Sequence, residues 1–193
     1  MIYIFYEWIE FLVRWLHVIA GIAWIGSSFY FIALDLSLLH KKDIPKKAHG
    51  EAWQVHGGGF YQIIKYLVAP ENMPSQLTWF KWEAYATWIS GFLLLIIIYY
   101  LSADLYMIEI DKFDLSKIEA ITISLIGIIL GWVLYDFLCK KTVNKNNDIL
   151  AIFILFIFTF FSWLYFQVFS FRGAYMQIGS MLGTIMVANV LMI

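Results

Sequence analysis

The stretch Arg14 to Asp35, RWLHVIAGIAWIGSSFYFIALD, decides the fold class, because it is apolar over most of its length yet contains an arginine, a histidine and an aspartate. An α-helix needs about 20 apolar residues to cross about 30 Å of hydrocarbon. An unsatisfied polar group in hydrocarbon costs several kcal/mol, so these side chains must face protein, water or a cofactor. The stretch therefore predicts a transmembrane helix with one polar face.

The rest of the chain has the same apolar character. Of its 193 residues, 62% are hydrophobic, 20% aromatic and 14% charged, and the mean hydropathy is +0.76. One water-soluble core of this length cannot bury so much apolar surface. The apolar runs are continuous and do not alternate with polar residues, which favours helices over barrel strands. We therefore predict an all-α, polytopic membrane helix bundle with about five spans, at residues 11–39, 79–101, 118–138, 149–171 and 174–193.

The distribution of positive charge predicts the orientation, because lysine and arginine are retained on the cytoplasmic side of a membrane. Most of the 13 lysines and arginines lie between the first two predicted spans or between the third and fourth. We interpret them as topology determinants, among them Lys41, Lys42, Lys46, Lys47 and Lys145. The N-terminus is therefore expected outside, and the first span is too long for a signal peptide. The net charge of −1 gives no reason to expect a nucleic-acid partner.

Helical spacing places the polar and small residues of the first predicted helix on or near one stripe. His17 would lie about 9 Å inside the outer boundary, at about 1.5 Å per residue. A buried histidine is often a hydrogen-bonding residue between helices, but it is also a common metal ligand, and Gly21 and Ser28 would leave room beside it for a flat porphyrin. Arg14 and Asp35 lie near the interfaces, where snorkelling or capping is the simpler interpretation.

The segment 40–78 is too polar to span the membrane and too aromatic for a solvated linker, so we predict an ordered interfacial cap loop. Its three consecutive glycines allow positive φ and expose backbone N–H groups, as in an anion nest where a flat anion would lie between aromatic rings. The simpler interpretation is a tight turn in an interfacial hairpin that is anchored by tryptophans. The candidate substrate-binding residues are His56, Gly57, Gly58, Gly59, Tyr61, Lys65, Lys81 and Glu83.

Small and polar residues in the later spans predict how the helices pack. Gly127 with Gly131, and Gly179 with Gly183, fit the Gly-x-x-x-Gly pattern, which indicates close helix packing or, alternatively, clearance for a cofactor. Gln177 and Asn189 are predicted to cross-link helices through hydrogen bonds.

An ordered set of motifs runs through the chain: residues 14–31, His56-Gly-Gly-Gly-Phe-Tyr61, Lys65-Tyr-Leu-Val-Ala-Pro70, Trp79-Phe-Lys-Trp-Glu-Ala-Tyr85, Trp88-Ile-Ser-Gly91, Tyr99-Tyr-Leu101, and Gly179-Ser-Met-Leu-Gly-Thr-Ile-Met186 with Asn189. Together they resemble the membrane domain of bacterial cytochrome c-linked urate oxidases. The resemblance implies oxidation of urate to 5-hydroxyisourate in purine catabolism, in the bacterial inner membrane, with electrons passed to a cytochrome c. It covers most of the chain, and it is weak between residues 102 and 171.

The same resemblance implies that residues 1–193 form a single membrane domain at the N-terminal end of a longer architecture. The single cysteine, Cys139, excludes a Cys-x-x-Cys-His haem attachment site in this chain. Haem c is therefore expected on a domain or partner outside it, and the isolated chain is not expected to be active by itself. Additional membrane helices or a second copy of the chain are possible partners.

The motif from Leu16 to Trp24 is also similar to that of membrane haem-binding oxidases such as the bacterial protoporphyrinogen oxidase. This second resemblance implies a haem b that has His17 as its iron ligand and Gly21, Trp24 and Ser28 around it. His56 is a weaker option for a second ligand, because it is predicted on the opposite side of the membrane. The alternative function is a non-catalytic haem b subunit for electron transfer or assembly.

Overall fold

The computed structural model describes residues 2–40, 43–142 and 147–191, so the predicted topology determinants Lys41, Lys42 and Lys145 lie outside the described residues. The described chain is mainly helical, which confirms the all-α class. It divides into two compact units. The first unit comprises Met1–Gly21 and Lys81–Ile193, and the second comprises Ile22–Phe80.

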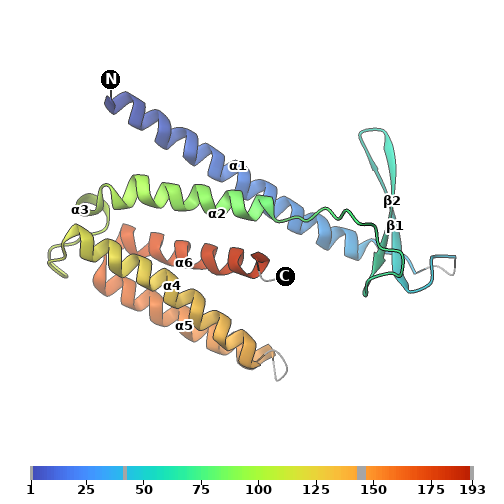
Figure 1. The fold of residues 1–193 in the computed structure, drawn as a ribbon. Coiled ribbons are helices and arrows are strands. Elements are labelled where there is room, and N and C mark those ends of the chain that lie inside the picture. Colours follow the sequence, from blue (N-terminus) through green and yellow to red (C-terminus); the bar gives the residue numbers. More distant parts are fainter. Residues whose placement is uncertain (1, 41–42, 143–146, 192–193) are drawn as a thin grey trace. The chain divides into compact units, whose positions relative to one another are not determined.

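The first unit contains the N-terminal part of helix α1 (Ile2–Leu36) and a helix bundle (Figure 1). Helix α1 begins before the predicted residue 11, and Glu10 pairs with Arg14 across one helical turn. The bundle comprises α2 (Trp82–Leu94), the π-helix η1 (Leu95–Tyr100), the short α3 (Ala103–Tyr106), α4 (Lys117–Thr142), α5 (Asn147–Val168) and α6 (Phe171–Leu191).

Helix length and composition identify a membrane protein. Among the described residues, four helices are long and apolar enough to cross a bilayer: Tyr3–Leu36, Trp82–Tyr100, Lys117–Thr142 and Leu150–Val168. They correspond to the first four predicted spans. Helix α6 occupies the position of the fifth, but it is not among those four. The number of crossings therefore stays a prediction.

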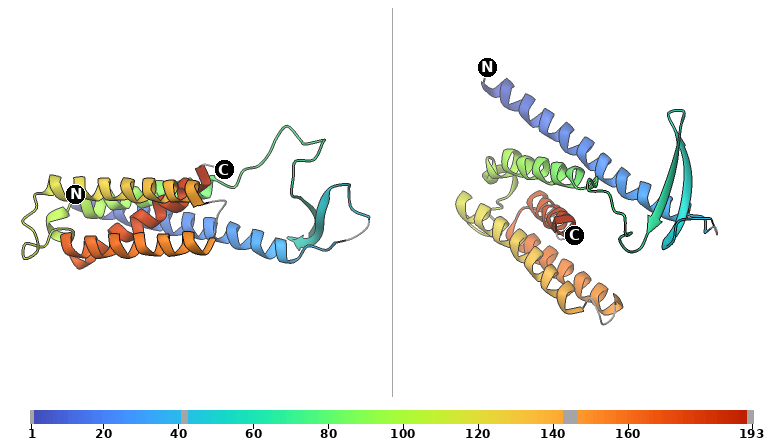
Figure 2. Two further views of the ribbon diagram at one scale, coloured as in Figure 1. Left: turned by 90° about the horizontal axis from the view of Figure 1, so that it is seen from below. Right: turned by 45° about the vertical axis from the view of Figure 1, so that its right-hand side comes forward.

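Helices α4, α5 and α6 pack against one another along their lengths (Figure 2). A Cβ atom at Gly127 would overlap the Tyr165 hydroxyl, and one at Gly131 would overlap the Met181 sulfur. Both buried side chains therefore occupy space that the glycines leave free, which confirms close packing at this first motif. At Gly179 and Gly183 an added Cβ would meet no described atom within 4 Å.

We expect Gly127→Ala to lower the stability of the bundle by about 1–3 kcal/mol, because the new methyl group displaces Tyr165 from a packed position. Thermal unfolding of the detergent-solubilised chain measures this loss. Gly179→Ala is the matched control, because the same substitution meets open space there and adds helix propensity. Equal unfolding temperatures for the two variants would contradict the packing argument.

Polar side chains connect the helices inside the bundle. The Ser124 hydroxyl of α4 donates to the Gln177 amide oxygen of α6 at 2.7 Å, and it also lies 2.7 Å from the Tyr100 hydroxyl. The Asn189 amide of α6 donates to the Tyr135 hydroxyl of α4 at 3.1 Å. The predicted cross-linking roles of Gln177 and Asn189 are thus confirmed.

The π-helix η1 continues directly from α2 and inserts one extra residue into the helical turn. The Leu101 N–H donates to the Ile96 carbonyl, five residues back, at 3.0 Å. Tyr99 and Tyr100 at its end are both buried, and they contact different neighbours: Tyr100 contacts Ser124, and Tyr99 contacts Arg172. Single π-turns of this kind are frequent at functional sites.

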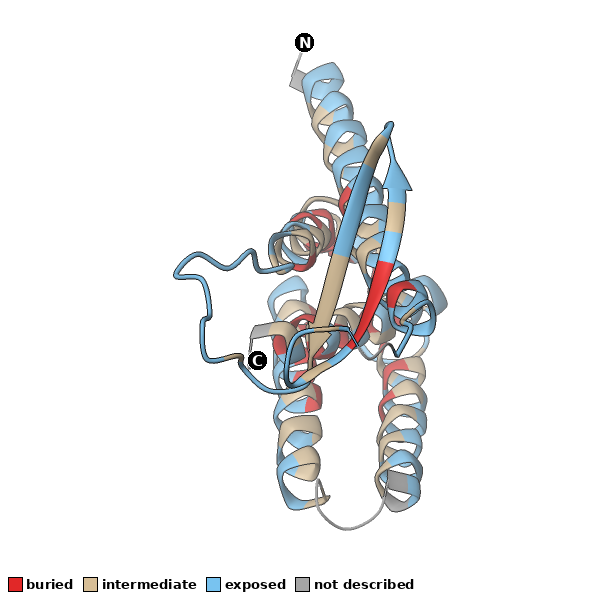
Figure 3. Cartoon of the chain, turned by 90° about the vertical axis from the view of Figure 1, so that its right-hand side faces the viewer, coloured by how far each residue is buried: buried red, intermediate tan, exposed pale blue. Residues whose placement is uncertain are grey.

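The second unit contains a β-hairpin that sequence analysis did not predict as strands. Strands β1 (Ala48–His56) and β2 (Gly59–Tyr66) pair antiparallel, and His56 lies opposite Gly59. The two turn residues, Gly57 and Gly58, have φ values of +57° and +80°, as a type I′ turn requires. The segment 40–78 is thus ordered in part as a hairpin with a tight turn. Most of the hairpin is exposed or half-buried (Figure 3).

One face of the hairpin contacts the C-terminal part of α1 within the second unit. Gln54 and Tyr61 are cross-strand partners, so their side chains share a face. The Tyr30 hydroxyl of α1 donates to the Gln54 amide oxygen at 2.8 Å, and Lys65 pairs with Asp35 at 2.6 Å. Asp35 therefore holds the base of the hairpin at the end of α1.

Candidate functional site

His17 lies between α1 and α2 in the first unit, where it is half-buried. Its Nδ1 atom is 3.0 Å from the Thr87 carbonyl oxygen and 3.2 Å from the Ser90 hydroxyl. Because a carbonyl oxygen only accepts hydrogen bonds, Nδ1 carries the proton of the neutral ring and donates it. The Nε2 atom is then the one with a free lone pair.

This arrangement of His17 fits an axial haem ligand. A metal-binding histidine usually donates its other ring nitrogen to a carbonyl or a carboxylate, which fixes the tautomer and the ring orientation. Among the described residues, Nε2 has no hydrogen-bond partner. A Cβ at Gly91 would lie 2.8 Å from the His17 Cε1 atom, so glycine there is needed for the ring position.

The other predicted cofactor residues contribute less to this site. A Cβ at Gly21 would be 3.8 Å from the Thr87 methyl group, an ordinary van der Waals contact, so the packing of α1 on α2 does not require glycine there. The Ser28 hydroxyl donates to the Trp24 carbonyl at 3.1 Å, within its own helix. Across the described residues, no group of three or more histidine, cysteine or acidic side chains forms a metal cluster.

A second candidate site is an open pocket of about 780 Å³ on the α1-facing side of the hairpin. It offers an amide, an imidazole and two phenol rings, which form hydrogen bonds and also present flat aromatic faces. A planar heterocyclic anion is the ligand class that this combination suits. The lining residues are Tyr30, Gln54, Val55, His56, Tyr61 and Ile63.

The predicted substrate residues fall into three groups. His56 and Tyr61 line the pocket. The three glycines shape the hairpin turn next to it, with Gly59 paired to His56, and their role as an anion nest stays a prediction. The charged candidates are not among the residues that line the pocket. Lys65 pairs with Asp35, while Lys81 and Glu83 are at the start of α2, which belongs to the first unit.

Sequence analysis missed several residues of these sites, among them Gln54, Tyr30, Thr87 and Ser90. Gln54 lies two residues before His56, and strand alternation would have placed both on one face once a strand was assigned. Tyr30, Thr87 and Ser90 meet their partners across long sequence separations, which no local pattern reports.

The fold defines an integral membrane helix bundle in which one histidine of α1 forms hydrogen bonds with α2. The family model described as urate oxidase N-terminal matches residues 3–193. No curated protein and no solved structure matches the chain significantly. The chain therefore belongs to the urate oxidase N-terminal family, which confirms the resemblance seen in its motifs and connects it to urate oxidation.

Proposed function

We propose that this chain takes part in membrane-bound oxidation of urate to 5-hydroxyisourate, a step of purine catabolism, and that the electrons pass to a cytochrome c. The family match carries the proposal, and the hairpin pocket supports it. The proposed setting is the bacterial inner membrane with the N-terminus outside. A cytochrome c domain or protein, outside this chain, is the proposed partner.

The pocket supplies the groups that urate recognition requires. Urate at neutral pH is a planar monoanion with alternating N–H and carbonyl groups on its edge. The Gln54 amide matches such an edge with one donor and one acceptor, while the Tyr61 ring offers a surface for stacking. In the overall reaction, urate and one water give 5-hydroxyisourate, two protons and two electrons. His56 lies in the pocket and is the proposed proton acceptor.

A haem b is proposed as the redox group, with His17 as its ligand. When bound, haem accepts and donates single electrons, which matches the one-electron capacity of a cytochrome c. The Thr87 carbonyl and the Ser90 hydroxyl hold the His17 ring, and Gly91 leaves space for it. These residues orient the ligand, and their own chemistry does not change during the reaction.

The proposal is tested with bacterial membranes that carry the complete protein. We expect urate to reduce added cytochrome c, with two equivalents reduced per urate consumed. Membranes from cells without the protein provide the background rate. Absence of urate-dependent reduction, in membranes where the protein is present and folded, would contradict the proposed activity.

A second candidate function is a non-catalytic haem b subunit for electron transfer or assembly. It is favoured by the His17 arrangement alone, which involves only α1 and α2 and does not require the hairpin pocket. This function predicts haem absorbance together with no urate binding. Equilibrium dialysis with urate therefore separates the two functions.

A further inference from the structure

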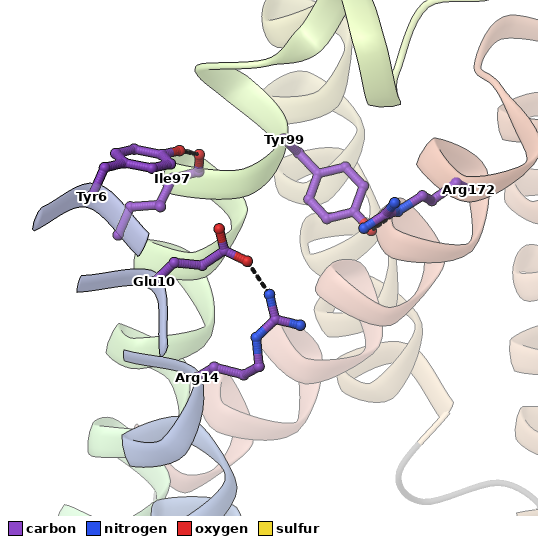
Figure 4. Close-up of polar contacts among 6 residues, drawn as sticks. All are labelled: Tyr6, Glu10, Arg14, Ile97, Tyr99 and Arg172. Atoms are coloured by element: carbon purple, nitrogen blue, oxygen red, sulfur yellow. Dashed lines mark hydrogen bonds and ion pairs between the residues drawn. The ribbon is translucent and has the colours of Figure 1, made fainter. Parts of the chain in front are cut away.

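Arg172 is an exposed cation at the beginning of α6 whose polar contacts are with tyrosines (Figure 4). Its Nε atom donates to the Tyr99 hydroxyl at 3.3 Å, and its guanidinium carbon lies 4.2 Å from the centre of the Tyr106 ring. The hydrogen bond with Tyr99 raises the pKa of Arg172 above its ordinary value. The group therefore stays charged.

Neighbouring acidic residues do not neutralise Arg172. Among the described residues, no carboxylate lies within 4.0 Å of its guanidinium. Glu10 pairs with Arg14, as Figure 4 shows, while Glu109 pairs with Lys112 at 2.9 Å and Asp104 pairs with Lys117 at 2.8 Å. Arg172 therefore keeps its positive charge without an ion-pair partner among the described residues.

The position of Arg172 places this charge at a membrane interface. Two of the apolar spans end close to Arg172 in space, at Tyr100 and Val168, and a third begins at Lys117. Hydrogen bonds hold these ends together, because the Ser170 N–H donates to the Met107 carbonyl at 2.8 Å and the Ser170 hydroxyl donates to the Tyr106 carbonyl at 2.7 Å. Helix ends of this kind lie at the level of the lipid headgroups.

We propose that Arg172, supported by Tyr99 and Tyr106, is a binding site for the headgroup phosphate of an anionic phospholipid. The fork of the guanidinium matches two phosphate oxygens, and the tyrosines hold it in one orientation. Because Arg172 has no ion-pair partner among the described residues, its positive charge favours an anionic lipid over a zwitterionic one, as in other basic sites between membrane helices. This site does not depend on the proposed urate chemistry.

The test is native mass spectrometry of the full chain released from nanodiscs that contain equal amounts of phosphatidylglycerol and phosphatidylcholine. Wild-type protein is expected to retain phosphatidylglycerol preferentially. Arg172→Gln is expected to reduce that retention about fivefold, and Arg172→Lys is expected to give an intermediate retention, because lysine keeps the charge but lacks the fork. Preferential retention that persists unchanged in Arg172→Gln would overturn the proposal, as would equal retention of both lipids by the wild type.

Lys140→Gln is the matched control, because it removes one positive charge from the opposite end of α4, where Lys140 pairs with Asp136 at 2.7 Å. This variant is expected to retain phosphatidylglycerol as the wild type does. An equal loss in both variants would mean that net charge alone controls retention, and the site would be rejected. Inorganic phosphate added to wild type is expected to leave the retained lipid in place, whereas its displacement would identify a free-anion site and overturn the lipid proposal.

Discussion

Replacing His17 with alanine is expected to abolish the Soret absorbance of the proposed haem b. In the structure, Nδ1 of His17 donates to the Thr87 carbonyl, which leaves Nε2 as the nitrogen that can bind iron. Alanine has no nitrogen to replace it. The measurement is the absorbance spectrum together with the haem content per protein, and neither depends on turnover.

Controls separate ligation from general loss of structure. His49→Ala changes a histidine of the second unit and is expected to leave the absorbance unchanged. Exogenous imidazole is expected to restore part of the Soret band in His17→Ala, because that substitution vacates the ring's position between α1 and α2. A full Soret band in His17→Ala would reject this ligand assignment, and His56→Ala would then test the other predicted ligand.

The second large effect is expected from Gln54→Leu in the hairpin pocket. Leucine has nearly the same volume as glutamine but removes both hydrogen-bonding groups from the pocket wall. A hydrogen bond to a charged ligand contributes about 1.5–3 kcal/mol, so the KM for urate is expected to rise about 10-fold to 100-fold. The kcat is expected to change little, because the amide binds the substrate and its transition state equally. Steady-state cytochrome c reduction by the complete protein measures both constants.

Gln62→Leu is the matched control on the other face of the hairpin. Gln62 lies opposite Trp53, one position along from the Gln54–Tyr61 pair, and its amide donates to Glu51 at 2.9 Å. The same substitution there leaves the pocket lining intact, so the KM is expected to stay near the wild-type value. An equal rise of the KM in both variants would mean that the substitutions impair hairpin folding. That result would contradict the assignment of the pocket as the substrate site.

The helices of this protein were predictable because the bilayer imposes a simple length rule on apolar runs. The predicted third span, residues 118–138, corresponds to α4, and the predicted fourth, 149–171, corresponds to α5. A tight hairpin turn was the simpler interpretation of segment 40–78, and the structure has it at Gly57 and Gly58, but the two aromatic and β-branched runs beside it were not assigned as strands. The interpretation as a membrane-surface cap took precedence over that local pattern.

The candidate sites were predictable only in part. His17 and His56 were found because polar residues in apolar or glycine-rich surroundings are conspicuous. The partner of His17 was not found, because Thr87 reaches it through packing between segments that are distant in sequence, and the hydrogen bond from Tyr30 to Gln54 was missed for the same reason. The ion pair between Lys65 and Asp35 likewise depends on how the hairpin folds back on α1, and composition does not report it.

The wide turn of η1 takes up one extra residue within this continuous helix. Successive residues of an α-helix are about 100° apart around its axis, so an extra residue in a regular α-helix would rotate one end against the other by that angle. The π-turn absorbs the residue instead, and the two ends keep nearly the phase of an α-helix that is one residue shorter. Deleting one residue from Leu95–Tyr100 would therefore restore regular geometry while Thr87 and Ser90 still faced His17 and Tyr100 still faced Ser124. This turn is thus the place where the helix tolerates a change of length without losing either set of contacts.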